Sequence, residues 1–144
     1  MNQKVKMKPS YLKIAFLDRD GTLIKDYPDE KWREIKEPEF LEGSIEGLKR
    51  LKEMGYDFII ITNQYLINDG IISLNDYQQF TGKFLKKLKE ENIDILKIYF
   101  CPHNEKDHCH CKKPKPGMIE QAKKDFLIDM NNSIYIGDSH VDYL

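Results

Sequence analysis

The chain has 144 residues and a mass of 17.1 kDa, the size of a single domain, and its 40% of hydrophobic residues suffices for a buried core. Its 23 basic residues nearly balance 24 acidic ones, and this balance excludes a general electrostatic attraction to nucleic acid or to anionic membranes. No apolar run approaches the ~20 residues that span a bilayer, and three cysteines cannot complete a disulfide framework.

These properties predict a cytoplasmic globular protein with one domain over residues 11–144. Met1–Ser10 is polar and predicts a loose N-terminal arm. Its lysines are not followed by the apolar run and small-residue cleavage site of a signal peptide.

In the first half of the chain, Lys13–Leu17 is a short apolar run that predicts a strand. The charged, proline-bounded stretch Glu30–Pro38 follows, and we interpret it as a surface loop. Ser44–Met54 has apolar residues on one helical stripe and Gly55 where a C-terminal cap belongs. Phe58–Ile61 is a second predicted strand.

In the second half, Ser73–Glu91 predicts a helix that opens with a capping box of Ser73 and Asp76. Ile95–Phe100 predicts a third strand, Gly117–Phe126 a third helix and Ser133–Ile136 a fourth strand. Strands that alternate with helices predict an α/β fold, with a parallel sheet covered by helices on both faces.

Polar clusters follow three of these strands immediately. They are Asp18-Arg19-Asp20, Thr62-Asn63-Gln64 and Gly137-Asp138. The carboxyl ends of parallel strands lie at one edge of a sheet, where open α/β folds bind their ligands. We therefore expect these residues to converge on one pocket.

The acidic pair Asp18 and Asp20 indicates phosphate chemistry. One carboxylate can attack phosphorus, and the other can protonate the leaving oxygen and later activate water. Because a carboxylate and a phosphate repel each other, Mg²⁺ is needed between them, and Asp18 with Asp138 offers it oxygen ligands. Gly21 would permit a tight turn, while Thr62 and a lysine would hold the other phosphate oxygens.

All three cysteines and three of the four histidines fall within Cys101–Cys111. Thiolates and imidazole close together are typical ligands of tetrahedral Zn²⁺, and a cytoplasmic protein favours metal binding over a disulfide. Spacing alone leaves open whether His103, His108 or His110 is the fourth ligand.

These residues together resemble the haloacid dehalogenase superfamily of phosphatases. Four motifs stand in the order of that family: Phe16–Leu23, Ile61–Gln64, Lys113-Pro114 and Ile136–Asp142. The resemblance implies a three-layer, Rossmann-like fold, in which a parallel sheet has helices on both faces. It also implies that Asp18 is the nucleophile and Asp20 the general acid and base.

The same resemblance implies the phosphate and magnesium ligands. Thr62, Asn63 and Lys113 would bind the transferred phosphoryl group. Mg²⁺ would be held by Asp18, the backbone carbonyl of Asp20 and Asp138. Asp142 would lie near that ion or only orient its loop.

The loop resembles the zinc loop of the histidinol-phosphate and heptose-bisphosphate phosphatases. That likeness selects as Zn²⁺ ligands Cys101, His103, Cys109 and Cys111. Four protein ligands leave no open position, so the zinc would be structural, and it would aim Lys112 and Lys113 at the pocket. His108 and His110 would then be solvated.

The features that bear on the substrate conflict. Lys113–Met118 and Gly70 resemble the heptose-bisphosphate enzymes, whereas the five residues between His103 and Cys109 resemble the histidinol-phosphate enzymes. Lys112 stands where the family commonly has arginine, which alone can grip a second phosphate bidentately. Trp32 could stack on a sugar or imidazole, or only cap the core.

We expect a phosphatase acting on a small phosphorylated metabolite, with a sugar bisphosphate of the heptose type ahead of histidinol phosphate. A nucleic-acid 3′-phosphatase and a zinc-stabilised binding module are the further alternatives. Family members continue beyond the fourth motif, so we expect a missing C-terminal unit whose edge another chain could cover in an oligomer.

Overall fold

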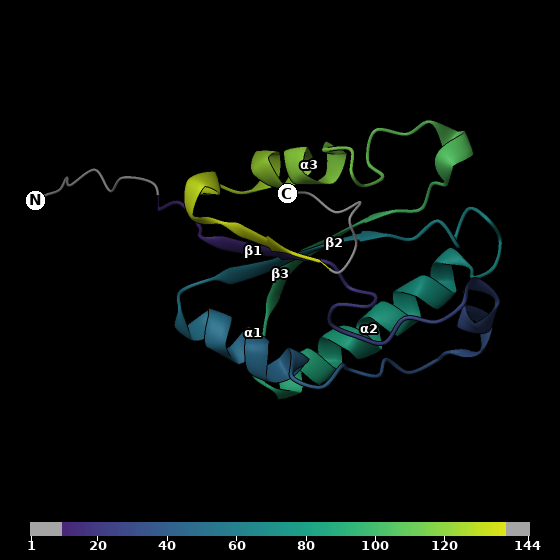
Figure 1. Cartoon of the computed structure of the whole chain (residues 1–144), viewed down its shortest axis with the longest axis horizontal. Coiled ribbons are helices and arrows are strands. Elements are labelled where there is room, and N and C mark those ends of the chain that lie inside the picture. The colour runs from purple at the N-terminus through teal and green to yellow at the C-terminus, as the bar shows by residue number, and fades with distance from the viewer. Residues whose placement is uncertain (1–9, 138–144) are drawn as a thin grey trace, which may run out of the picture.

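A computed structural model describes residues 10–137, so most of the predicted N-terminal arm, Asp138 and Asp142 lie outside the described part. Its centre is a parallel sheet with the strand order β3-β2-β1-β4 (Figure 1). The strands are β1 (Ile14–Leu17), β2 (Asp57–Asn63), β3 (Ile95–Cys101) and β4 (Ile134–Ile136). All four predicted strands are confirmed.

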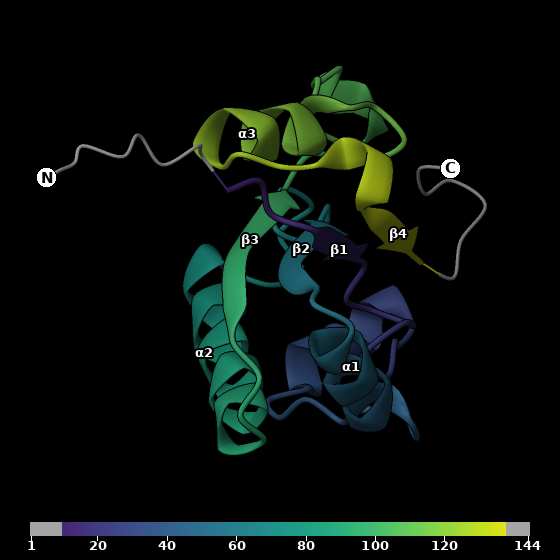
Figure 2. The ribbon, with the colours of Figure 1, turned by 90° about the vertical axis from the view of Figure 1, so that its left-hand side faces the viewer.

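Three α-helices cover the two faces of this sheet (Figure 2). α1 (Ser44–Glu53) and α2 (Leu74–Glu90) lie on one face, and α3 (Gly117–Asp125) lies on the other. The predicted capping box is present, because the Ser73 hydroxyl accepts from the Asp76 N–H and the Asp76 carboxylate accepts from the Ser73 N–H. Because helices cover both faces of the sheet, the predicted three-layer α/β architecture is confirmed. Short 3-10 helices span Asp29–Glu34, Glu105–Asp107 and Met130–Asn132.

The apolar strands are buried on both faces because successive side chains point to opposite sides of the sheet. Toward α1 and α2 lie Ala15, Leu17, Phe58 and Ile60, packed with Leu48, Phe84 and Leu88 of the helices. Toward α3 lie Ile14, Phe16, Ile59 and Ile61, packed with Met118 and Ala122. Two cores therefore hold the sheet rigid beneath its carboxyl edge.

The stretch Glu30–Pro38 is more ordered than the predicted surface loop. Most of its side chains are exposed, but it contributes to a 3-10 helix, and Trp32 is only 6% exposed. The indole packs edge-on against Tyr27 and Phe80, with ring centroids 5.0 and 5.6 Å away. Burial of this one large ring fixes an otherwise charged segment onto the core.

Among the described residues, no helix is both long and apolar enough to cross a membrane.

The start of α3 is packed closely against the loop that precedes it. A Cβ added to Gly117 would stand 2.5 Å from the carbonyl oxygen of His110 and 2.9 Å from Cys111 Cα. The Gly117 N–H also donates to that His110 oxygen over 3.1 Å. The absence of a side chain at Gly117 lets this loop lie against the helix.

We predict that Gly117→Ala lowers the free energy of unfolding by about 1–3 kcal/mol, because the new methyl group must displace backbone. Urea denaturation measures this change. Gly82→Ala in α2 is the matched control, since nothing lies within 4 Å of the added Cβ. Its expected effect is a gain of up to about 1 kcal/mol from helix propensity. Equal stabilities of the two variants would contradict the close packing.

Candidate active site and metal-binding cluster

The strand order brings the predicted motifs to one edge of the sheet. β1 lies between β2 and β4, so Asp18, which follows β1, is close to Thr62 at the end of β2. The chain crosses from one face of the sheet to the other before it enters β4, and ligands of open α/β folds bind at such a reversal of strand order.

The centre of this edge is an ion pair between Asp18 and Lys113. Lys113 Nζ lies 3.0 Å from Asp18 Oδ1, and the two side chains are 3% and 13% exposed. The same carboxylate oxygen accepts a hydrogen bond from the Arg19 backbone N–H over 2.9 Å. A buried ion pair with further hydrogen bonds offsets much of its desolvation cost, and these contacts fix the direction of the carboxylate.

Lys113 is held in place from two further sides. Its backbone N–H donates to Asn63 Oδ1 over 2.9 Å, and Asn63 Nδ2 donates to the Lys113 carbonyl over 3.4 Å. Its ammonium donates to the Tyr135 hydroxyl over 2.8 Å. Residues of β2 and β4 thus position a lysine that lies in the loop between β3 and α3.

Asp20 is oriented by two side chains. Arg19 grips it bidentately, with Nε 2.6 Å from Oδ1 and Nη2 3.1 Å from Oδ2. Gln64 Nε2 donates to Asp20 Oδ2 over 3.1 Å and to Thr62 Oγ1 over 2.8 Å. Arg19, Thr62 and Gln64 are all buried, so the position of the Asp20 carboxylate is fixed.

The loop after β1 turns sharply at Gly21, as predicted. Gly21 has a φ of +82°, in the left-handed region that favours glycine. Its N–H donates to the Ile24 carbonyl over 2.8 Å, and the Arg19 carbonyl accepts from Leu23 and Ile24. This turn keeps both carboxylates at the end of β1.

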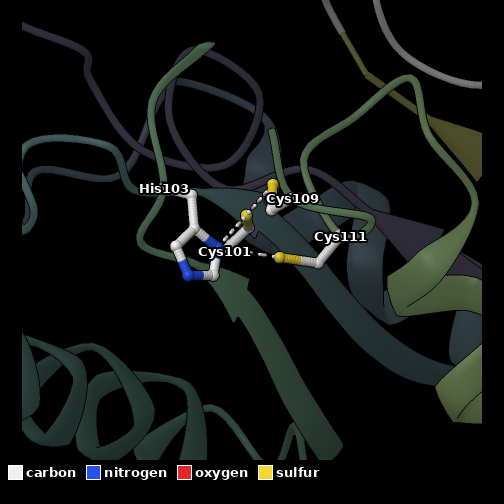
Figure 3. Close-up of side chains that lie close together, drawn as sticks. All are labelled: Cys101, His103, Cys109 and Cys111. Carbon is white, nitrogen blue, oxygen red and sulfur yellow. Dashed lines mark hydrogen bonds between the residues drawn. The ribbon is translucent and has the colours of Figure 1, made fainter. Parts of the chain in front are cut away.

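A second cluster lies at the end of β3 and in the loop that follows it. One Sγ or ring-nitrogen atom from each of its four side chains lies within 4.8 Å of the others, and they belong to Cys101, His103, Cys109 and Cys111 (Figure 3). His103 Nδ1 lies 3.3 Å from the Sγ atoms of both Cys101 and Cys111, and Cys101 Sγ lies 3.5 Å from Cys109 Sγ. The set could hold a metal ion.

The electrostatics of the three thiols differ. Burial raises the pKa of Cys101 and of Cys111. Burial also opposes ionisation of Cys109, but a hydrogen bond from the Lys112 backbone N–H and contacts with the other thiols lower its pKa to about 6. One thiol is therefore ready to ionise, and the thiolate is the form that binds metal.

The cluster is connected directly to the lysine of the sheet edge. The Lys112 N–H donates to Cys109 Sγ over 3.3 Å, and Lys115 Nζ donates to the Cys109 carbonyl over 2.7 Å. Lys112 Nζ lies 3.5 Å from Glu105 Oε1 and 6.0 Å from the Tyr65 ring centroid. Whatever fixes the cluster also fixes the backbone directly before Lys113, and the Lys115 side chain ties the segment after it to Cys109.

The structure brings together most of the predicted site residues within the described part. Asp18, Asp20, Thr62 and Lys113 share the sheet edge, and His103 completes the cysteine cluster, while His108 and His110 are exposed. Asn63 holds the backbone of Lys113, so its predicted contact with phosphate stays a prediction. Trp32 is packed in the core, which favours its core role over a substrate contact.

The roles of Arg19, Gln64 and Tyr135 were not predicted. Arg19 and Gln64 stand inside the recognised motifs, and this position beside the predicted site residues was the one sequence feature that pointed to them. Tyr135 stands in a predicted strand, and nothing in the local sequence distinguishes its hydroxyl from that of any other strand tyrosine.

Comparison with known proteins decides the family. A family model described as polynucleotide kinase 3 phosphatase matches residues 13–141. The chain belongs to this family of phosphatases. It is 42% identical over 144 aligned residues to a D-glycero-alpha-D-manno-heptose-1,7-bisphosphate 7-phosphatase of Photorhabdus laumondii, with 94% of this chain and 77% of that protein covered. A Pasteurella multocida protein named as the corresponding beta-heptose enzyme is 41% identical, with 92% and 74% covered.

A solved structure agrees with these relatives. The D,D-heptose 1,7-bisphosphate phosphatase of B. bronchiseptica, complexed with magnesium and phosphate, superposes with a TM-score of 0.80 at 27% identity. The alignment covers 91% of this chain and 73% of that one. The resemblance to haloacid dehalogenase phosphatases of the heptose-bisphosphate subgroup is thereby confirmed.

We predict that Asn63→Ala lowers the free energy of unfolding by about 1–2 kcal/mol, because the buried backbone N–H of Lys113 loses its acceptor. Urea denaturation measures the change. Asn75→Ala is the matched control, since Asn75 is exposed on α2, and its expected effect is close to zero. If Asn63→Ala were as stable as the control, Asn63 would not hold the lysine loop.

Proposed function

We propose that this phosphatase hydrolyses a phosphomonoester of a small sugar bisphosphate of the D-glycero-D-manno-heptose 1,7-bisphosphate type. The observation that carries the proposal is the buried contact between Lys113 Nζ and Asp18 Oδ1, with Asp20 fixed beside it at the same strand end. The relatives named for that substrate support its chemical class.

In the first step, Asp18 attacks the phosphorus and forms an aspartyl-phosphate, while the ester P–O bond breaks. Asp20 donates a proton to the leaving sugar oxygen. Lys113 stands within hydrogen-bond distance of the attacking carboxylate, so its ammonium can also bind an oxygen of the arriving phosphoryl group. Thr62 would donate to another oxygen once its hydroxyl hydrogen turns from the Asn63 carbonyl, and it can still accept from Gln64.

In the second step, Asp20 accepts a proton from water, which attacks the aspartyl-phosphate. The P–O bond to Asp18 breaks, so the carboxylate is restored and inorganic phosphate leaves. Arg19 and Gln64 position Asp20 through both steps because each donates to its carboxylate. Both side chains act here only as hydrogen-bond donors, so they orient Asp20 and leave the proton transfer to its carboxylate.

Mg²⁺ fits the carboxylate at the end of β1. Asp18 would supply a carboxylate oxygen, the backbone carbonyl of Asp20 would supply a second ligand, and Asp138, outside the described residues, would supply a third. Oxygen ligands of this kind suit a hard divalent cation. When bound, the ion would neutralise the charge between carboxylate and phosphate.

Zn²⁺ fits the second cluster. Three thiols and one imidazole are a common structural zinc set, and all four ligand positions come from the protein. The ion would stabilise the loop that carries Lys112 and Lys113 and take no part in the reaction.

We predict that Asp18→Asn lowers the rate of phosphate release by about 10⁴-fold or more, because an amide cannot act as the nucleophile. The rate is measured with Mg²⁺ and heptose bisphosphate, and circular dichroism checks the fold. Asp57→Asn is the matched control, since Asp57 is exposed at the opposite end of the sheet, and it should keep full activity. An active Asp18→Asn variant would overturn the assigned nucleophile.

We predict one zinc ion per chain by elemental analysis. Cys109→Ser should lose the ion and lower the melting temperature by about 10 °C, the effect of losing a ligand present well above its dissociation constant. His110→Gln should keep the zinc, because His110 is exposed and contacts Glu120 instead. Zinc loss in both variants, or in neither, would contradict the assigned ligands.

The proposal is tested by phosphate release from a panel of substrates. The panel holds both anomers of heptose 1,7-bisphosphate, because the two relatives are named for different anomers. It also holds histidinol phosphate and a 3′-phosphorylated oligonucleotide, the second candidate favoured by the description of the family model. A preference for heptose bisphosphate supports the proposal, and a preference for either of the others contradicts it.

A further inference from the structure

A cavity of about 130 Å³ lies between the 3-10 helix Asp29–Glu34 and the first half of α2. Three aromatic side chains line it together with one buried cation, namely Trp32, Tyr77, Phe80 and Arg19. None of the predicted catalytic or phosphate-binding residues lines it. The cavity is therefore separate from the sheet edge, although Arg19 belongs to both.

Arg19 carries spare hydrogen-bonding capacity beside this cavity. Its side chain is 3% exposed, and Nε and Nη2 are occupied by Asp20. Nη1 is buried and has no hydrogen-bond partner among the described residues. A buried donor without an acceptor costs about 1–3 kcal/mol, so an anion that reaches Nη1 as the surrounding side chains shift would relieve a cost already present.

The aromatic rings surround the guanidinium. Its carbon lies 5.0 Å from the ring centroid of Phe80, 5.7 Å from that of Trp32 and 5.8 Å from that of Tyr77. These rings also give the cavity flat apolar walls against which another ring can pack. An engineered protein cavity of ~150 Å³ accommodates benzene, so the volume here suits one ring.

The rim of the cavity has a surplus of positive charge. Arg33, Lys36 and Lys83 line it against a single acid, Asp76, which caps α2. Lys83 is paired with Glu37 over 2.6 Å. Asp76 offsets part of the charge of Lys36, so Arg33 and Lys36 together leave the opening a net positive charge that attracts an anion.

We infer that this cavity binds a small organic anion with a single ring, whose ring packs against Trp32, Tyr77 and Phe80. Its carboxylate or phosphate group would lie between Arg19 and Lys36. This inference goes beyond the proposed function, because it concerns a ligand other than the substrate. The ligand and Asp20 would contact the same guanidinium, that of Arg19.

Binding can be measured without turnover because Trp32 is the only tryptophan of the chain. Benzoate, added to the full chain, should change the tryptophan fluorescence saturably with a dissociation constant of about 1 mM or below. Phenylphosphonate, which is not a phosphoester, provides the phosphate-like arm, and the tighter of the two probes identifies the anion. Failure of the proposed phosphatase activity would leave these readings unchanged.

Lys36→Glu should weaken the binding of the better probe about tenfold, since it reverses one charge of the rim. Lys87→Glu is the matched control, because Lys87 is exposed further along α2 and does not line the cavity. Its dissociation constant should equal that of the unaltered chain. Benzyl alcohol, which lacks the charge, should bind at least about tenfold more weakly than benzoate. Inorganic phosphate, which lacks the ring, should not displace bound benzoate at equal concentration.

Three results would overturn the inference. The first is the absence of a saturable change with both anionic probes. The second is equal binding of benzyl alcohol and benzoate, which would remove the anion from the assignment. The third is equal weakening by Lys36→Glu and Lys87→Glu, which would place the effect outside this cavity.

Discussion

The contact between Lys113 and Asp18 joins the parts of the molecule on which the site depends. The two residues are 95 positions apart, and both are nearly inaccessible to water. Neither charge would be tolerated there alone, because an unpaired buried charge is strongly destabilising. The end of β1 and the loop before α3 are therefore required to meet, and Asn63 and Tyr135 fix the angle at which they do so.

The sheet positions the two aspartates, and the cysteine-histidine cluster positions the loop that carries Lys113. The sheet is rigid because both faces are packed, and it sets the positions of Asp18 and Asp20. The lysine comes from an irregular loop, which has no ladder of hydrogen bonds to hold it. The Lys112 backbone N–H donates to Cys109 Sγ, which gives that loop a fixed point one residue before Lys113, and the Lys115 ammonium adds a contact to the Cys109 carbonyl. A metal ion at the cluster would stabilise the same point.

The fold could be predicted from short-range patterns because each element has its own local cause. The apolar runs are too short for helices, and the Ser73–Asp76 box begins α2 where expected. The meeting of the Asp18–Asp20 and Thr62–Gln64 motifs at one sheet edge also followed from parallel topology alone. Trp32 could not be placed in this way, because its burial depends on Tyr27 and Phe80, which the segment meets only in the tertiary structure. The hydroxyl of Tyr135 and the Gln64 bridge from Asp20 to Thr62 likewise depend on distances between strands.

The central claim is that Asp18 is phosphorylated during turnover, and mass spectrometry tests it most directly. The chain would be mixed with heptose 1,7-bisphosphate and Mg²⁺, quenched in acid and digested for peptide analysis. The account predicts one added phosphoryl group on the peptide that contains Asp18, localised to that residue and absent from Asp18→Asn. Phosphate release without any phosphorylated Asp18, or with the group on another residue, would contradict it.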